Sequence, residues 1–441
     1  MKNLVICLFF ATFLFGCNFG NEPSVAKLPT AKPIIIGIVS VKNTLTVDTT
    51  TMADNLVFSY QWYAADVPIN NAIEKTYTLT SNEIGKTITV KVSWTNTDNT
   101  SESRLSKATI AVIILKAEEN FIDYAFLQKQ ALSLATKYPI FSTKVIGKSI
   151  ENRDIIAFKI SSQVNTDSAQ KAKIVLVGTY HAREWIVPNV VYLIAQQLLE
   201  DYGANSEITA LIDNSEIWLV PMVNPDGHEY SRINASTRYW RKNRRDNGDG
   251  TYGVDLNRNH SFKWGYDDTG SSPTTSSNTY RGKTPASEPE TQAIERFVTE
   301  IHPQIFVSYH SYSQLVLYPW GYINDPSKDN TQLSAIATKI SEAIKEVHGK
   351  VYKPSSTPEV LYNTNGDVID WSYGALDILS FLIELRPGGW PSTGINGFSP
   401  HKDEILPTFE ENYNAIKYLL SAAQNIKNSP IKSLKLSQEH E

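Results

Sequence analysis

The residues best suited to catalysis or metal binding lie at or near the ends of apolar segments. The segment GTYHAREW follows the apolar run KIVLVG and places His181 and Glu184 three positions apart. His310 closes a second apolar run, IFVSYH, and Glu384 lies inside a third, LSFLIEL. Two histidines and a glutamate suit a Zn²⁺ site that keeps a fourth position for water. We therefore expect one Zn²⁺ per chain, which would activate water and polarise a carbonyl. Glu384 would accept the proton of that water.

The surrounding pattern indicates how the chain would bring these groups together. Apolar strands alternate with amphipathic helices from about residue 118, and such a pattern is typical of an α/β sheet covered on both faces. Ligands of these sheets bind beyond the carboxyl ends of the strands. Ser287 and Glu290 have the spacing of a capping box at the start of one helix. The predicted strands are 173–178, 216–223, 305–310 and 379–385, and the predicted helices are 186–202, a helix from near Ser287, and 331–347.

None of these features identifies a site alone. A His-x-x-Glu pair is common on protein surfaces, and His310 by itself could be a hydrogen-bonded core residue. The chain has no HExxH motif, which excludes the helical zinc-protease site as the template. The remaining histidines lack a carboxylate nearby at a strand end and are given no metal role; they are His228, His260, His302, His348, His401 and His440.

Seven motifs, taken in order, resemble the zinc carboxypeptidases related to pancreatic carboxypeptidase A. They are HAREW, VNPDGHEYS, YWRKNRR, GVDLNRN, HSYSQLVLYPWGY, DVIDWSYG and FLIELRP, and they fall within a domain that we place at residues 118–425. The resemblance implies an α/β/α sandwich with a mixed sheet of about eight strands. It implies hydrolysis of the last peptide bond by zinc-activated water. It also implies cis bonds at Ser311–Tyr312 and Arg386–Pro387.

The resemblance gives each matching residue a role. His181, Glu184 and His310 would bind zinc, and Glu384 would be the catalytic carboxylate. Arg241 would stabilise the oxyanion of the tetrahedral intermediate, where charge develops only in the transition state. An exopeptidase must also recognise a free carboxylate, which an arginine can bind through two parallel hydrogen bonds. The residues implied for substrate binding are Asn257 and Arg258 at that carboxylate, Tyr362 closing over it, and Arg183, Ser311 and Tyr312 beside the upstream residues.

The segment NTNGDVID (363–370) is expected to line the pocket for the departing side chain. Relatives that prefer basic side chains carry Asp at the matching pocket floor, whereas Ile369 stands there in this chain and favours Phe, Tyr and Leu. Asp367 lies two residues upstream, and an extended segment would point both side chains the same way. An acidic wall would then add secondary activity on Lys and Arg. The alternative is that Asp367 is only a turn residue after Gly366.

The N-terminal part of the chain has a different organisation. The segment MKNLVICLFFATFLFGC is typical of a bacterial lipoprotein signal at residues 1–16, after which lipid on Cys17 would hold the exported protein at a membrane of the cell envelope. An ordinary cleaved signal is the alternative. Residues 17–32 are polar and contain prolines, so we expect a tether. Residues 426–441 are predicted to form a polar tail.

Residues 33–115 are predicted to form an immunoglobulin-like β-sandwich. Alternating segments at 57–63 and 87–94 are rich in Thr, Val, Ile and Tyr, and Trp62 is the expected core aromatic residue. The segment lacks His, Cys and clustered carboxylates, so we expect a spacer or binding module. An inhibitory pro-segment is the alternative.

Charge and composition limit the function classes. The chain has 41 basic and 46 acidic residues, a net charge of -5, and no basic block. These features argue against nucleic-acid binding. We expect a monomer that acts on peptide or protein C-termini. Two other functions stay open, a non-catalytic domain that captures peptide ends and a peptidase for peptidoglycan stem peptides.

Overall fold

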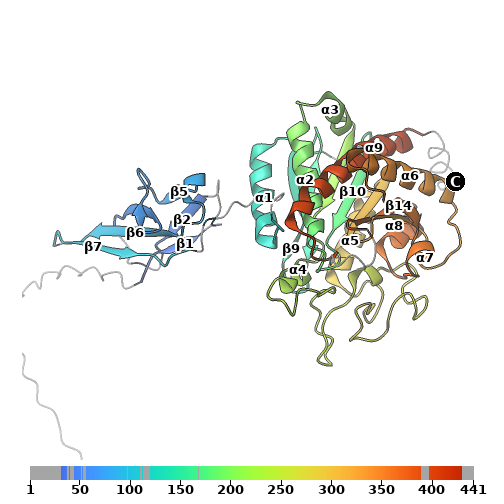
Figure 1. Ribbon diagram of the computed structural model, residues 1–441, viewed down its shortest axis with the longest axis horizontal. Coiled ribbons are helices and arrows are strands. Elements are labelled where there is room, and N and C mark those ends of the chain that lie inside the picture. Colours follow the sequence, from blue (N-terminus) through green and yellow to red (C-terminus); the bar gives the residue numbers. More distant parts are fainter. Residues whose placement is uncertain are drawn as a thin grey trace, which may run out of the picture. The chain divides into compact units, whose positions relative to one another are not determined.

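The computed structural model describes residues 31–429, apart from 37–38, 40–43, 51, 53–55, 97, 110–111, 113–119, 167 and 389–396. The chain divides into two compact units, Met1–Leu115 and Lys116–Glu441 (Figure 1). The predicted signal, Cys17 and most of the tether lie outside the described residues, as does the tail from residue 430. Within the described ranges, no helix combines the length and apolar character needed to cross a membrane.

The N-terminal unit contains two antiparallel sheets with the strand orders β1-β2-β5 and β4-β3-β6-β7. Trp62 on β3 is fully buried, as predicted, and its indole N–H donates to the Glu74 carbonyl at 2.9 Å. The immunoglobulin-like assignment stays a prediction. The strands are β1 (Ile34–Ile36), β2 (Thr44–Asp48), β3 (Ser59–Ala64), β4 (Val67–Pro68), β5 (Thr76–Thr78), β6 (Ile88–Thr95) and β7 (Ser101–Leu105).

The second unit is built on one eight-stranded sheet with the order β14-β13-β15-β12-β10-β11-β9-β8. Its four central strands, β15, β12, β10 and β11, are parallel neighbours, whereas β8, β9 and β13 each make antiparallel pairs. The predicted mixed sheet is therefore confirmed. The strands are β8 (Phe141–Lys148), β9 (Asp154–Ile160), β10 (Ala172–Gly178), β11 (Ser215–Val220), β12 (Ile305–Ser311), β13 (Leu315–Tyr318), β14 (Lys353–Ser356) and β15 (Leu379–Leu385).

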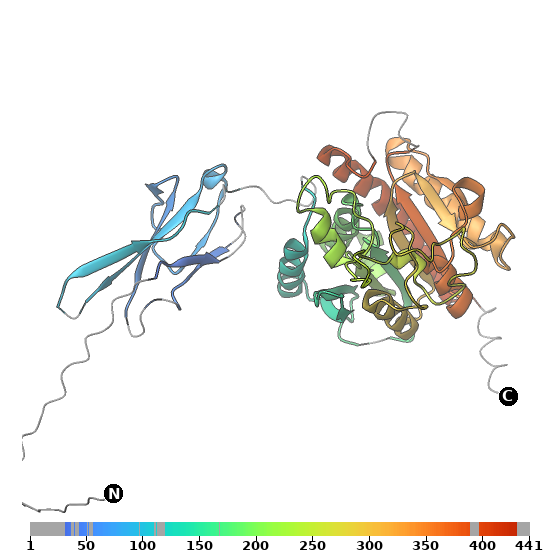
Figure 2. The same cartoon turned by 90° about the horizontal axis from the view of Figure 1, so that it is seen from below.

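Helices cover both faces of this sheet (Figures 1 and 2). Successive residues of a strand point to opposite faces, and Val175 and Val177 of β10 share a buried cluster with side chains of α5 and α8. The alternate residues Ile174 and Leu176 are buried on the other face, where α2 and α9 contact β10 and α6 packs against α9. The helices are α1 (Tyr124–Lys137), α2 (Ile186–Asp201), α3 (Ser206–Asp213), α4 (Pro225–Ser231), α5 (Pro289–Ile301), α6 (Asn330–His348), α7 (Thr357–Val360), α8 (Val368–Leu376) and α9 (Ile405–Lys427).

Two local predictions were wrong at their boundaries. The strand expected at 216–223 ends at Val220, because Pro221 has no N–H for the ladder. Ser287 does not cap α5, which begins at Pro289 with Glu288 as N-cap and without a side-chain capping bond. The Glu290 carboxylate instead accepts the backbone N–H of Ile150 at 2.9 Å.

The peptide bonds predicted to be cis, Ser311–Tyr312 and Arg386–Pro387, are both cis. Pro319–Trp320 is also cis, which the sequence analysis did not anticipate.

Candidate functional site

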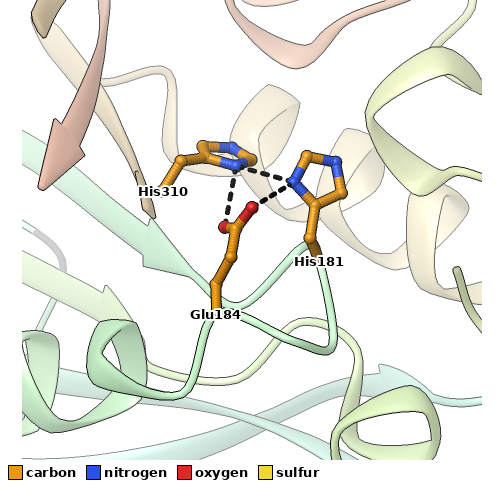
Figure 3. Close-up of side chains that lie close together, drawn as sticks. All are labelled: His181, Glu184 and His310. Atoms are coloured by element: carbon orange, nitrogen blue, oxygen red, sulfur yellow. Dashed lines mark hydrogen bonds and ion pairs between the residues drawn. The ribbon is translucent and has the colours of Figure 1, made fainter. Parts of the chain in front are cut away.

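Three predicted metal ligands meet at the carboxyl ends of two parallel strands (Figure 3). The chain leaves β10 through Thr179, whose φ of 60° turns the backbone and whose hydroxyl donates to the Pro221 carbonyl at 2.8 Å. His181 and Glu184 follow in this loop, and His310 comes from β12. The His181 Nδ1 lies 2.8 Å from Glu184 Oε1, and the His310 Nδ1 lies 3.2 Å from Glu184 Oε2.

The donor set fits a Zn²⁺ ion. One ligand atom from each of these three buried residues lies within 4.8 Å of the others, and the two Nδ1 atoms are 3.1 Å apart. The Nε2 atom of each ring, on the side away from the other ligands, has its own hydrogen-bond partner. His181 Nε2 lies 3.2 Å from Asp255 Oδ1, and His310 Nε2 lies 3.0 Å from Ser308 Oγ. Such outer partners fix the ring orientation of metal-binding histidines. The arrangement presents two imidazole nitrogens and a carboxylate to one point.

The electrostatics of the group favour the protonation states that zinc needs. Burial raises the pKa of Glu184, but the neighbouring His181 and His310 outweigh it and hold that pKa well below the usual range. Burial lowers the pKa of His310 and thus favours its neutral form. Metal ligands must be deprotonated carboxylates and neutral imidazoles.

Asp255 joins the metal group to the predicted oxyanion residue. Its Oδ2 accepts from Arg241 Nε at 2.9 Å and lies 2.9 Å from the Arg241 Nη2, while its Oδ1 faces His181. Although burial raises the pKa of Asp255, Arg241 and His181 lower it well below the usual value. No role was predicted for Asp255. Its only signal was an acidic residue inside the motif GVDLNRN, between two apolar residues.

Glu384 lies beside the metal group without belonging to it. It stands directly opposite His310 in the register of β15 and β12, and it is not among the three clustered ligands. Desolvation and the nearby Glu184 raise its pKa well above the usual value, against the lowering effect of Arg241. A carboxylate with a raised pKa is suited to receive and return a proton.

Every predicted site residue lines at least one of two cavities, which share Arg241, Leu361, Tyr362 and Glu384. The inner cavity is lined by His181, Arg241, Asn257, Arg258, His310, Tyr362, Asp367, Ile369 and Glu384, among others. The outer cavity, of ≈ 300 Å³, is lined by Arg183, Glu184, Arg241, Ser311, Tyr312, Tyr362 and Glu384, together with Phe398 and two neighbours.

The inner cavity contains a cation that lacks a full set of partners. Arg258 is 2 % exposed, and its Nη1 donates to the Asn257 carbonyl at 2.6 Å. Its Nε is buried and has no hydrogen-bond partner. Asn257 Oδ1 accepts the N–H of Val368 at 3.0 Å and so ties this turn to the first residue of α8. Buried polar groups are normally satisfied, but the Arg258 Nε is an unpartnered donor on a residue that lines the inner cavity.

The structure corrects the local reading of Asp367. The segment is not extended, because α8 begins at Val368 and Asp367 is its N-cap, accepting from the Asp370 N–H at 2.9 Å. Gly366 precedes it with a φ of 67°, where a Cβ would lie 2.5 Å from the Arg258 carbonyl. The prediction that Asp367 and Ile369 belong to one extended segment was therefore wrong. Asp367 and Ile369 nevertheless both line the inner cavity.

The α/β unit and its His-Glu-His group define a class of metal-dependent enzyme, and the comparisons with known proteins show which family it is. The sequence model described as zinc carboxypeptidase matches residues 124–415. The chain belongs to this zinc-dependent hydrolase family, and zinc is the metal that its His-Glu-His group fits.

Relatives and solved structures agree with this assignment. Carboxypeptidase A1 of Mus musculus is 37% identical over 287 residues, which are 64% of this chain and 65% of that protein. Carboxypeptidase B of Astacus astacus is 33% identical over 304 residues, 68% of this chain and 95% of that protein. The structure of bovine thrombin-activatable fibrinolysis inhibitor with tick carboxypeptidase inhibitor aligns with a TM-score of 0.63 at 29% identity, covering 71% of this chain and 100% of that one.

Proposed function

We propose that this protein removes the last residue of peptides or proteins as a zinc-dependent carboxypeptidase. The observation that carries the proposal is the placement of Arg258. Its buried, partly unpartnered guanidinium shares one cavity with two metal ligands and Glu384. A protease that cuts internal bonds has no need of a buried cation at this place, whereas a free C-terminus requires one.

The residues of the chain divide the work of the reaction. Arg258 and Asn257 would hold the terminal carboxylate, so that the last peptide bond reaches the ligand group and Glu384. When bound, Zn²⁺ lowers the pKa of water and polarises a carbonyl. Glu384 would accept a proton and return it to the departing amine. Arg241, oriented by Asp255, would stabilise the negative charge that develops on the carbonyl oxygen.

A release profile on a peptide library tests the proposal. Purified protein should liberate single C-terminal residues, activity should cease with a chelator and return with Zn²⁺, and C-terminally amidated peptides should resist. Binding of peptide ends without turnover would favour the capture function instead. Faster release from peptidoglycan fragments than from ordinary peptides would favour the cell-wall function.

We propose further that the inner cavity prefers apolar side chains and accepts basic ones second. Ile369 supports the first preference and the buried Asp367 carboxylate the second. Asp367→Asn is expected to abolish release of Lys and Arg while Phe and Leu release stays within about twofold. Because Asn caps helices as well as Asp does, the start of α8 should survive. Equal loss of both activities would contradict the acidic wall.

The release of basic residues should also depend on pH. Burial raises the pKa of Asp367, and burial together with Asp367 raises the pKa of Asp370 well above the usual value. At the acid end of the profile Asp367 would hold a proton and could not pair with a cation. The ratio of Arg release to Leu release should therefore rise with pH in the wild type. It should stay flat in Asp367→Asn.

The site of action rests on the sequence alone. We propose that the chain is exported and lipid-anchored through Cys17 at a membrane of the cell envelope, and that it acts there as a monomer. The segment MKNLVICLFFATFLFGC supports the anchor. In bacterial cells, labelled palmitate should be incorporated into the wild type. Cys17→Ser should lose both the label and the membrane association, and its retention in the membrane fraction would argue against a lipid anchor.

A further inference from the structure

His260 occupies a place that neither the metal group nor the substrate pocket explains. It follows the carboxylate-binding turn directly and is fully buried. Both ring nitrogens have partners, since Nε2 lies 3.1 Å from the Tyr180 hydroxyl and Nδ1 lies 3.1 Å from Glu295 Oε1. No role was predicted for His260, which has no carboxylate nearby at a strand end; its partners lie 80 residues before it and 35 residues after it in the chain.

The chemistry of Glu295 sets the direction of its hydrogen bond with His260. The Glu295 carboxylate also accepts the N–H of Ser261 at 2.9 Å. Although burial raises the pKa of Glu295, the hydrogen bond and charge of His260 lower it overall, so Glu295 is an acceptor. The His260 Nδ1 must then carry the hydrogen. The His260 Nε2 forms the second hydrogen bond of the ring, with the Tyr180 hydroxyl at 3.1 Å.

His260 itself is held rigidly. Its backbone N–H donates to the Gly366 carbonyl at 2.9 Å. Its ring stacks on Trp371 of α8, with centroids 5.3 Å apart and planes 27° apart. With Glu295 on α5, three separate parts of the fold fix the ring. The Nε2 atom is therefore a stationary hydrogen-bond partner for the Tyr180 hydroxyl.

Tyr180 contacts the metal group through the ring of His310. It immediately precedes His181, and its ring stacks against the His310 ring at 5.9 Å with planes 22° apart. Its carbonyl accepts from Asn224 Nδ2 at 3.0 Å. A rotation of the Tyr180 ring would therefore disturb His310 by contact and His181 through the backbone.

We propose that His260 is a positioning residue that sets the geometry of the zinc site through the Tyr180 hydroxyl. It is outside the clustered ligand group and is not among the residues that line the two cavities, and it acts by fixing the ring that supports His310. The inference does not require the proposed peptidase activity, only the metal group.

The test uses Tyr180→Phe and His260→Phe in the full chain. Phe keeps an aromatic ring at either position but breaks the hydrogen bond. We expect each variant to bind Zn²⁺ about tenfold more weakly in chelator competition, the lower end for outer partners of metal ligands. With Co²⁺ alone as the probe, the visible absorption bands should shift in both variants. The double variant should be no weaker than the worse single variant, because the two changes break the same bond.

Tyr373→Phe is the matched control. Tyr373 is a buried tyrosine of α8 whose hydroxyl donates to Asp329 Oδ2 at 2.9 Å, away from the metal group. It should lose stability but keep the Zn²⁺ affinity and the Co²⁺ spectrum. Unchanged affinity and spectrum in Tyr180→Phe would overturn the proposal, even if His260→Phe failed to fold. An equal loss of affinity in the Tyr373 control would overturn it too. Absence of peptidase activity would instead contradict only the proposed function.

Discussion

Glu384→Gln is expected to keep one Zn²⁺ per chain and to lower kcat by about 10²–10⁴-fold, the usual contribution of a positioned proton acceptor. The amide has nearly the same shape as the carboxylate but cannot take a proton from water. Glu384 is outside the clustered ligand set, so the metal should remain. Metal analysis and steady-state kinetics on one preparation measure both quantities.

The control for this variant is Glu410→Gln. Glu410 of α9 is half-buried, and its carboxylate lies 2.8 Å from the His348 Nε2. Its replacement should leave kcat unchanged. Near-normal turnover by Glu384→Gln would show that another group accepts the proton. Loss of zinc from that variant would show that Glu384 contributes to metal binding.

Arg258→Ala is expected to lower kcat/KM for peptides with a free C-terminus by about 100-fold or more. Each hydrogen bond to a charged group contributes about 1.5–3 kcal/mol, and the terminal carboxylate can take two from one guanidinium. Arg258→Lys should recover only part of the loss, because an ammonium group cannot form the parallel pair. The wild type, Arg258→Ala and Arg258→Lys should all hydrolyse amidated peptides at nearly the same low rate.

Kinetics on matched free-acid and amide peptides give the discriminating ratio. Arg296→Ala, at an exposed position of α5, is the control and should keep the wild-type ratio. An Arg258→Ala enzyme that still preferred free C-termini by the wild-type factor would show that a different cation recognises the carboxylate.

Interactions between distant residues were the part of the site that sequence reasoning missed. Asp255 lies 74 positions from His181, and its role appears only when the loop after β10 meets the turn at η2 (Leu256–Arg258). His260 was set aside for the same reason. A one-dimensional pattern reports periodicity and neighbours along the chain, and it contains no distance between segments.

The error at Asp367 has a different physical origin. The segment around Asp367 was predicted to be extended, but α8 begins one residue later. A short segment does not distinguish an extended chain from the first turn of a helix, because the capping bond from the Asp370 N–H exists only in the folded geometry. Asp367 thus lines the inner cavity as a helix N-cap and not as part of an extended segment.

The sequence by itself determined the ligand types and the sheet that carries them. One apolar run is followed by His181 and Glu184, and another ends at His310. This pattern follows from the need to bury strands on both faces while the polar ligands remain beyond their ends. Tertiary structure alone decided how these groups are held. Strand pairing placed Glu384 opposite His310, and Asp255 faced His181 and Arg241 together. Packing of the whole domain offsets the entropy cost of bringing together groups that are far apart in the chain. No local pattern can therefore reveal their close approach.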